Sequence, residues 1–341
     1  MKHIIIHCGM PKTGTSALQV QLAKSRDTFL KHGYDYLATG IGDDAKKGRI
    51  TSGNGFELAQ AYLPPKHRVS RAQDCAKITE KMRAAITATP HHVILSSEFF
   101  AHLPHPNLGE LVTALSDLGK VVLVFMVREQ VNALASSYIQ GVKRSRQVQF
   151  PDEFFADLDL SKHRLLAYNT YFKRLRARAK TATLLVKPYE LSKAHPAGLM
   201  GLFLEMIGAE IPAGDLPADS HVNLSPSPQE VRMMIEVNRH HPRMRFSDML
   251  VEASHLAGRS TIYAEHAMIP PDTVAKIRAF FDAENAAFFD TFAKCENIYQ
   301  KAGDTEFINP REVTFEATEV MDMLLGLLVA MDRRLAKLEA G

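Results

Sequence analysis

Residues 3 to 16 read HIIIHCGMPKTGTS, and this stretch decides the fold that the sequence predicts. The isoleucines from Ile4 to Ile6 form a β-branched run that is typical of a strand buried on both faces. The run ends at Gly9 in a short segment of glycines and hydroxyl side chains. Residues 16 to 30 then place apolar side chains at helical spacing. We therefore expect a strand, a tight loop and a helix in that order.

On the C-terminal side of this stretch, apolar strands alternate with helical segments. Helices are expected near residues 72–88, 107–119 and 130–145, and strands at residues 93–95, 121–127 and 183–186. This alternation predicts an α/β fold in which helices flank a parallel, P-loop-like sheet. We assign residues 1–310 to this domain, with a mostly helical part at 196–310 and a separate amphipathic helix at 311–341.

Residues 38 to 70 carry five glycines and the pair Pro64-Pro65. This composition predicts a long irregular loop, and such loops inside a domain often bind ligands. We expect the loop to shape a substrate pocket. Asn54 and Phe56 could contact the substrate, although an ordinary surface loop is the stronger interpretation for these two residues.

Composition excludes several classes of protein. The net charge of +3 comes without a basic run, so no nucleic-acid surface is expected. Three widely spaced cysteines argue against a disulfide framework and a zinc site, and no metal site is expected. No apolar run reaches the roughly 18 residues of a membrane span. These features predict a cytoplasmic protein.

The segment from Gly9 to Ser16 has the chemistry of an anion site. A loop between a buried strand and a helix collects anions through its backbone N–H groups and the helix dipole. The ordinary P-loop places its lysine directly after the second glycine, but here Lys12 precedes Gly14 and Thr15 follows it.

This stretch resembles the 5′-phosphosulfate loop of the PAPS-dependent sulfotransferases, most closely the bacterial and carbohydrate-type branches. The resemblance implies that the loop binds the donor PAPS and its product PAP without a metal. It also implies that Lys12 is catalytic and contacts the bridging oxygen and the sulfuryl group. The loop residues that would bind the donor are Pro11, Lys12, Thr13, Gly14, Thr15 and Ser16.

A second motif of the family follows the strand at 121–127. The resemblance assigns Arg128, at the end of this strand, and Ser136, eight residues later, to the donor's 3′-phosphate. The guanidinium fork suits phosphate oxygens, and a serine two turns along a helix can face the same ligand. The sequence departs from the family at Gln130 and Ala133, where many members carry proline and some carry arginine.

An acceptor hydroxyl or amine must lose a proton as it attacks sulfur, so a general base is required. Glu98 is our first choice, because it follows a strand at the edge where parallel sheets bind ligands. His102 is the second choice. The expected reaction is an in-line transfer of the sulfuryl group to a small-molecule or carbohydrate acceptor.

Two alternatives remain open. A P-loop nucleotide kinase or NTPase would share the fold but would need Mg²⁺. A non-catalytic nucleotide-binding protein would keep the loop and transfer nothing.

The C-terminal segment carries apolar residues at alternating spacings of three and four. This heptad pattern comprises Thr314, Ala317, Met321, Leu324, Leu328, Met331, Leu335 and Leu338. It predicts either a homodimer formed through this helix or an amphipathic helix packed on its own domain.

Overall fold

The computed structural model describes residues 1–38, 52–69, 74–216, 225–241, 264–300 and 306–339, with a few single residues between 247 and 256. The chain forms two compact units. The sheet unit comprises Met1–Glu129, Arg164–Val222 and Ala283–Tyr299. The helical unit comprises Gln130–His163, Asn223–Asp282 and Gln300–Gly341. Our expectation of one domain at 1–310 stays a prediction.

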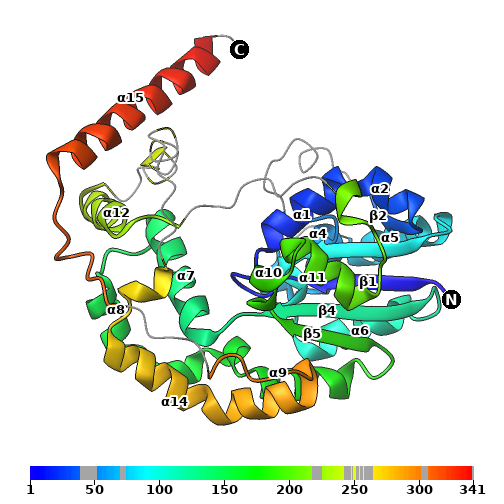
Figure 1. Ribbon diagram of the computed structural model, residues 1–341. Helices are drawn as coiled ribbons and strands as arrows, with labels where there is room; N and C mark the ends of the chain where they lie inside the picture. The colour runs from blue at the N-terminus through cyan, green and yellow to red at the C-terminus, as the bar shows by residue number, and fades with distance from the viewer. Residues whose placement is uncertain are drawn as a thin grey trace. The chain divides into compact units, whose positions relative to one another are not determined.

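The sheet unit is built on a five-stranded, all-parallel sheet in the order β2-β3-β1-β4-β5 (Figure 1). Its strands are β1 (His3–Cys8), β2 (Tyr34–Tyr36), β3 (His92–Ser97), β4 (Lys120–Val127) and β5 (Thr183–Pro188). The predicted α/β class with a parallel sheet is confirmed. The sequence pattern missed β2, because this strand has three residues and carries the polar Asp35 at its centre.

Alternate residues of β1 enter two different apolar layers. Ile4 and Ile6 pack in one layer, whereas Ile5 packs in the other. The first layer is closed by α4 (Phe56–Tyr62), α5 (Cys75–Ala88), α6 (His105–Leu115), α9 (Tyr168–Arg178) and η7 (Phe289–Ala293). The second is closed by α1 (Thr15–Lys24), α2 (Arg26–Lys31) and α11 (Gly198–Ile207). The isoleucine run is therefore buried on both faces, as predicted.

The segment at 38–70 is less irregular than predicted. Residues 39–51 and residue 70 lie outside the described residues. The part from 52 to 69 contains α4, whose sequence FELAQAY favours a helix, followed by η1 (Pro65–His67). The glycines and prolines that indicated a loop flank α4 rather than occupy it.

The remaining short elements are η2 (Glu98–Phe100), η4 (Arg164–Leu166), α10 (Leu191–Ala194) and η5 (Ala213–Asp215) in the sheet unit, and η3 (Leu160–Lys162) and η6 (Glu265–Met268) in the helical unit. The helical unit also contains α7 (Gln130–Lys143), α8 (Pro151–Ala156), α12 (Pro228–His240) and α15 (Ala317–Glu339). Helix α14 (Pro271–Phe288) passes from the helical unit into the sheet unit after Asp282. The prediction of a largely helical C-terminal part is confirmed.

No helix among the described residues has both the length and the apolar character needed to cross a membrane.

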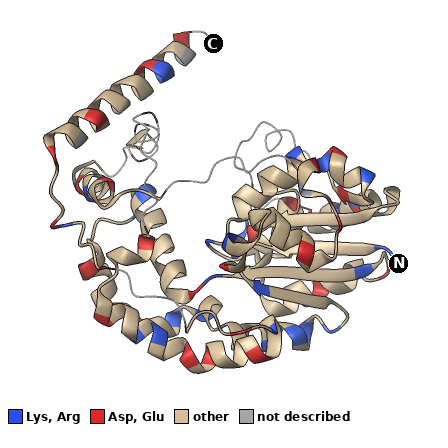
Figure 2. Ribbon diagram, in the orientation of Figure 1, with Lys and Arg blue, Asp and Glu red and all other residues tan. Residues whose placement is uncertain are grey.

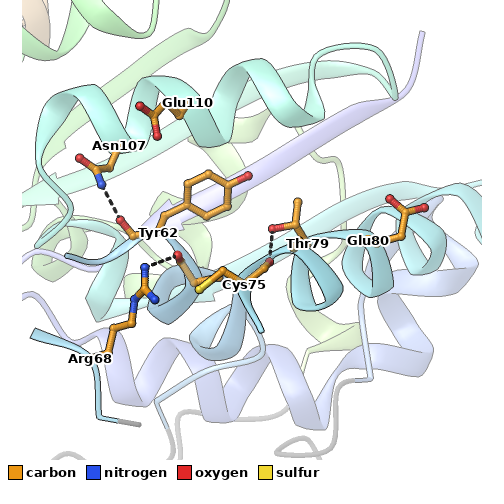
Figure 3. Close-up of a pocket in the computed structure, with 9 residues that line it drawn as sticks. Tyr62, Arg68, Cys75, Thr79, Glu80, Asn107 and Glu110 are labelled. Atoms are coloured by element: carbon orange, nitrogen blue, oxygen red, sulfur yellow. Dashed lines mark hydrogen bonds between the residues drawn. The ribbon is translucent and has the colours of Figure 1, made fainter. Parts of the chain in front are cut away.

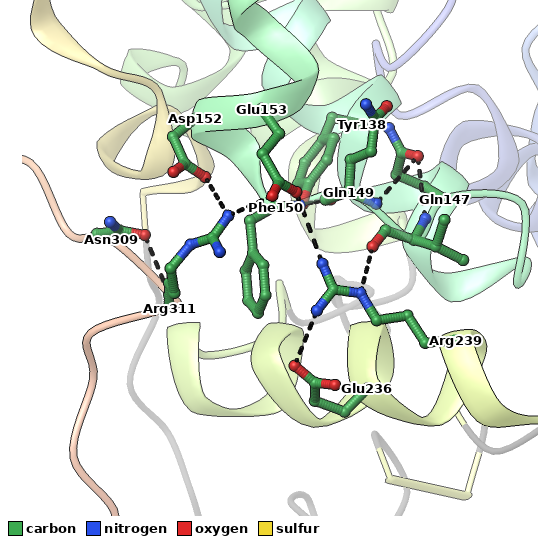
Figure 4. A network of polar contacts seen from close by, with 11 residues as sticks. Tyr138, Gln147, Gln149, Phe150, Asp152, Glu153, Glu236, Arg239, Asn309 and Arg311 are labelled. Atoms are coloured by element: carbon green, nitrogen blue, oxygen red, sulfur yellow. Dashed lines mark hydrogen bonds and ion pairs between the residues drawn. The ribbon is translucent and has the colours of Figure 1, made fainter.

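A polar network joins α8 to α12 inside the helical unit (Figure 4). The guanidinium groups of Arg239 and Arg311 lie over the ring of Phe150, 4.7 and 4.5 Å from its centroid. Both also pair with the carboxylate of Glu153, at 3.6 and 2.7 Å. The hydrogen bond from Arg311 lowers the pKa of Glu153. The network therefore keeps its carboxylate charged and links three separate segments of the unit.

Helix α15 packs through a different face from the one that the heptad pattern defines. Met323 and Ala330 are buried, and Gly326 lies against the backbone of Ala253. The heptad residues Met321 and Leu328 are instead more than half exposed. The helix therefore packs on its own unit, as one alternative predicted, but the heptad face stays uncovered in the single chain.

Candidate functional site

The candidate site lies at the carboxyl edge of β1. This strand occupies the centre of the sheet, with β3 on one side and β4 on the other. Cys8 is in register with Ser97 of β3, and the backbone N–H of Gly9 donates to the carbonyl of Ser97 at 3.1 Å. The loop after β1 and the turn after β3 thus begin side by side, where open α/β sheets bind ligands.

The loop from Gly9 to Ser16 has an unusual backbone. Lys12 adopts a left-handed conformation with φ 66°, and Gly14 does so with φ 73°. Positive φ is rare for residues other than glycine and tends to occur at ligand-binding sites. The hydroxyl of Thr13 is buried and donates to the carbonyl of Met10 at 2.8 Å. The loop is therefore closed on itself by a side-chain bond.

Two glycines permit close packing around the loop. A Cβ at Gly9 would lie 2.4 Å from the methyl carbon of Thr15, so no side chain fits between the start of the loop and the start of α1. A Cβ at Gly14 would lie 2.6 Å from Leu199, in addition to the strain of its positive φ. Both glycines are therefore required by the packing of the protein around the loop.

The end of the loop fits a phosphate or sulfate group. Helix α1 begins at Thr15 without a side-chain cap on its backbone N–H groups. The hydroxyl oxygen of Thr15 is buried and has no hydrogen-bond partner among the described residues. Lys12 and the positive end of the helix dipole add positive potential at the same place. This donor set matches the oxygens of an anionic group and could hold the 5′-phosphate and sulfuryl group of PAPS.

Arg128 reaches back from the end of β4 to this loop. Its guanidinium donates to the carbonyl of Lys12 at 3.1 Å and lies 5.7 Å from the ring centroid of Tyr189. The hydroxyl of Tyr168 donates to the carbonyl of Arg128 at 2.6 Å and fixes the backbone there. Two of the residues selected from the sequence, Lys12 and Arg128, are thus brought together.

Ser136 lies on α7, in the helical unit, and is buried. Arg128 belongs to the sheet unit, and the shared 3′-phosphate site of Arg128 and Ser136 stays a prediction.

Glu98 is the first residue of η2 and is exposed. The cap of this short helix is the hydroxyl of Ser97, which accepts from the N–H of Phe99 at 3.3 Å, so the Glu98 carboxylate is not used as a cap. His102 follows η2 and is also exposed. The pKa of its imidazole is lowered by partial desolvation, an effect that the charge of Glu98 opposes. Both candidate bases therefore remain accessible to an acceptor.

A buried polar cluster under the loop was not predicted. His7 of β1 lies with its Nδ1 2.8 Å from the hydroxyl of Ser96, and the amide of Gln19 donates to the same hydroxyl at 3.2 Å. Complete burial lowers the pKa of His7 to about 4, so the ring is neutral at pH 7. A polar residue inside the run HIIIHC was the one sequence signal for this cluster.

Asn54, a candidate acceptor contact from the sequence, has its side chain engaged within the protein. It is buried, and its side-chain NH₂ donates to the carbonyls of Leu37 and Ile94 at 3.2 and 2.9 Å. Its side-chain oxygen accepts from the N–H of Ser96 at 2.7 Å. Asn54 thus ties its segment to β3 and to the residue that follows β2. Phe56 packs against Phe99, next to Glu98, with ring centroids 5.1 Å apart.

A separate pocket of about 480 Å³ lies between α4, α5 and α6 (Figure 3). Arg68 at its edge donates to the carbonyls of Leu63 and Ala61 at the end of α4. None of the loop residues 9–16 lines this pocket, so it is distinct from the candidate site.

The fold and the loop define a P-loop-like α/β protein in which the lysine of the loop after β1 precedes the second glycine. Among solved structures, the chain resembles the sulfotransferase from Alicyclobacillus acidocaldarius, with a TM-score of 0.50 and 12% sequence identity, covering 88% of this chain and 99% of that one. No family model and no curated protein matches the sequence at a significant level. The structural match confirms a sulfotransferase-like fold, and at this identity it speaks for the fold alone.

Proposed function

We propose that the protein is a sulfotransferase that moves a sulfuryl group from PAPS to a hydroxyl or amine of a small-molecule or carbohydrate acceptor. The observation that carries this proposal is the loop from Gly9 to Ser16, with Lys12 in a left-handed conformation and Arg128 bonded to its carbonyl. Two cations and an uncapped helix N-terminus meet there, which suits a donor that carries several negative charges.

The proposed reaction is an in-line displacement at sulfur. The acceptor oxygen or nitrogen forms the new bond to sulfur, and the bond from sulfur to the bridging oxygen of the donor breaks. Lys12 offsets the charge that develops on the departing oxygen, and Glu98 takes the acceptor's proton. PAP is the leaving group of this reaction. Its 5′-phosphate stays bound in the loop until the product dissociates. Arg128 and Ser136 are proposed to hold the 3′-phosphate.

The melting temperature with PAP tests the donor site. PAP without metal should raise the melting temperature because it binds the folded state only. Arg128→Ala should abolish the rise, and Arg174→Ala, which removes an exposed arginine of α9, should preserve it. A rise that persists unchanged in Arg128→Ala would contradict the assignment of Arg128.

Conversion of PAPS to PAP with a panel of hydroxyl and amine acceptors tests the chemistry. Lys12→Ala should lower turnover about 100-fold or more, because it removes charge stabilisation from the transition state. Lys24→Ala, at the other end of α1, is the matched control and should be neutral. PAP binding without transfer to any acceptor would favour the non-catalytic alternative.

One observation favours a second candidate, a Mg²⁺-dependent kinase or NTPase. Glu98 follows β3, the direct neighbour of the loop-bearing β1, and a carboxylate in such a position can help to hold Mg²⁺. The same thermal measurement separates the two functions. A rise that needs both ATP and Mg²⁺, with no rise for PAP, would replace the sulfotransferase proposal with this one.

A further inference from the structure

The peptide group that follows Arg128 is held from both sides. Arg128 and Glu129 come directly after β4, a cation and then an anion (Figure 2). The carbonyl between them accepts from the hydroxyl of Tyr168 at 2.6 Å, and the N–H donates to Oε1 of Glu190 at 2.9 Å. Tyr168 lies on α9 and Glu190 follows β5, and all four residues belong to the sheet unit. Side chains from two other parts of the chain therefore fix the main chain at Arg128.

The peptide group before Arg128 is anchored as well. The carbonyl of Val127 accepts from the N–H of Tyr189 at 2.6 Å and from the hydroxyl of Tyr299 at 3.1 Å. Two consecutive peptide groups, one on each side of the Cα of Arg128, thus have partners outside β4. Because both groups are held, the side chain of Arg128 starts from one defined point and in one defined direction.

The two residues after β5 act on Arg128 at both of its ends. Glu190 holds the main chain, and the guanidinium lies 5.7 Å from the ring centroid of Tyr189. The same ring borders the loop, because a Cβ at Gly14 would lie 3.3 Å from it. The guanidinium also donates to the carbonyl of Lys12. The turn after β5 therefore connects Arg128 to the loop that is proposed to bind the donor.

Glu190 lies in an unfavourable environment for a charged carboxylate. Burial raises its pKa, whereas the hydrogen bond from Glu129 and the charge of Arg128 oppose that shift. Ordinary packing of a turn does not require a buried charge, because a neutral acceptor would satisfy the same N–H at a lower desolvation cost. Carboxylates with perturbed pKa values gather at functional sites. The burial of Glu190 therefore agrees with a role in the site.

We infer that Glu190 is a positioning residue that fixes the main chain at Arg128, so that the guanidinium meets the 3′-phosphate of the donor. The inference rests on the proposed function, in which Arg128 binds this phosphate. Glu190 does not touch the donor in this arrangement, since its negative charge would repel a phosphate. It acts through Arg128, because a residue that is already fixed loses less conformational freedom when the donor binds.

Calorimetric titration with two nucleotides tests the inference. PAP carries the 3′-phosphate, and 5′-AMP lacks it. Glu190→Ala should weaken the binding of PAP about 10-fold, since the lost bond has a charged acceptor, and should leave the binding of 5′-AMP unchanged. General damage to the fold would weaken both nucleotides alike. In turnover, the KM for PAPS should rise while kcat stays nearly constant, because the 3′-phosphate takes no part in the reaction.

Two conservative variants separate position from charge. Glu190→Gln keeps the length and an acceptor oxygen, so PAP should bind within about threefold of the wild-type affinity. Glu190→Asp keeps the charge, but its carboxylate is one methylene shorter and cannot reach the N–H of Glu129. PAP binding should therefore weaken as in Glu190→Ala. If Glu190→Ala does not fold, the contrast between these two variants carries the test.

The matched control is Asp35→Ala, which removes a buried carboxylate of β2, three strands away from β4 in the sheet. It removes the ion pair with Arg26, so the melting temperature should fall while the affinity for PAP stays unchanged.

Three results would overturn the role of Glu190 alone. The first is wild-type affinity for PAP in a folded Glu190→Ala variant, and the second is equal weakening of PAP and 5′-AMP. The third is a loss in Glu190→Gln that Glu190→Asp avoids, because it would assign the effect to charge. A wild type that binds 5′-AMP as tightly as PAP would overturn the 3′-phosphate role of Arg128, and this inference with it. A wild type that binds neither nucleotide would overturn the proposed function itself.

Discussion

At the scale of single residues, the buried His7 makes stability depend on pH. Its pKa falls from the ordinary 6.5 to about 4 in the folded protein because the ring is fully buried. Between these two values the unfolded chain binds a proton that the folded protein does not bind. Stability must therefore fall as the pH is lowered through this window.

We expect the titration of His7 to lower the free energy of unfolding by about 3 kcal/mol as the pH falls from 6.5 to 4. His7→Gln should lose less stability than the wild type over the same range, since glutamine does not titrate. Urea denaturation at several pH values measures this difference. His67→Gln, at an exposed histidine, should follow the wild-type curve. Parallel curves for wild type and His7→Gln would mean that His7 is not held neutral.

Gly14 and Gly208 offer a comparison between strain and crowding. Both have positive φ, at 73° and 67°, but a Cβ at Gly208 meets nothing within 4 Å, whereas one at Gly14 would meet Leu199. Gly208→Ala should cost about 1–2 kcal/mol through left-handed strain alone. Gly14→Ala should cost more and should also weaken PAP binding, which calorimetric titration measures. Equal losses in stability at both positions would contradict the packing around the loop.

At the scale of elements, the sequence predicted what its own local pattern encodes. The apolar strands and the helices that follow them lie close to their predicted ranges, because each carries enough buried side chains to define its period. The strand β2 and the helix α4 were missed because they are short and draw their stability from distant partners. Asn54 shows this: its side chain bonds residues 37, 94 and 96, and no local pattern reports such contacts.

In the candidate site, too, the local part could be predicted from the sequence and most of the long-range contacts could not. The loop with Lys12 and Gly14 is contiguous in sequence and was found there. The bond between Arg128 and Lys12 spans 116 residues, and the contact between His7 and Ser96 spans 89. The role of Arg128 could be predicted because the residue belongs to a second sequence motif. No motif contains Ser96, so its contact with His7 could not be predicted.

Asn54→Ala should lower the free energy of unfolding by about 2–4 kcal/mol, because it removes bonds to buried backbone groups of β3 and of Leu37, next to β2. Asn107→Ala is the matched control. That asparagine is partly buried and makes one side-chain bond, to the carbonyl of Tyr62 at 2.9 Å, so its loss should cost about 1 kcal/mol. Urea denaturation measures both variants. A loss at Asn54 no larger than at Asn107 would show that the bridge between β2 and β3 contributes little.

At the scale of the whole molecule, donor binding should change amide hydrogen exchange only around the loop that binds the donor. PAP should slow amide hydrogen exchange in residues 9–16 and in the first turn of α1, where backbone N–H groups are proposed to meet the phosphate. The exchange of α15 should not change, since no part of the proposed donor site lies on it. Mass spectrometry of peptic fragments measures both regions. Protection centred on the pocket near Tyr62 and Arg68 would move the donor site there.

The interleaving of the two units has a consequence for synthesis on the ribosome. The sheet unit needs its last segment, Ala283–Tyr299, in which Glu284 bonds Thr170 and the hydroxyl of Tyr299 donates to the carbonyl of Val127 at 3.1 Å. Phe288, Phe289 and Phe292 of this segment complete the apolar layer on one face of the sheet. The nascent chain therefore cannot finish the unit that holds the loop until residue 299 has been translated. Until then, this face of the sheet exposes apolar side chains, and exposed apolar surface of this kind favours aggregation.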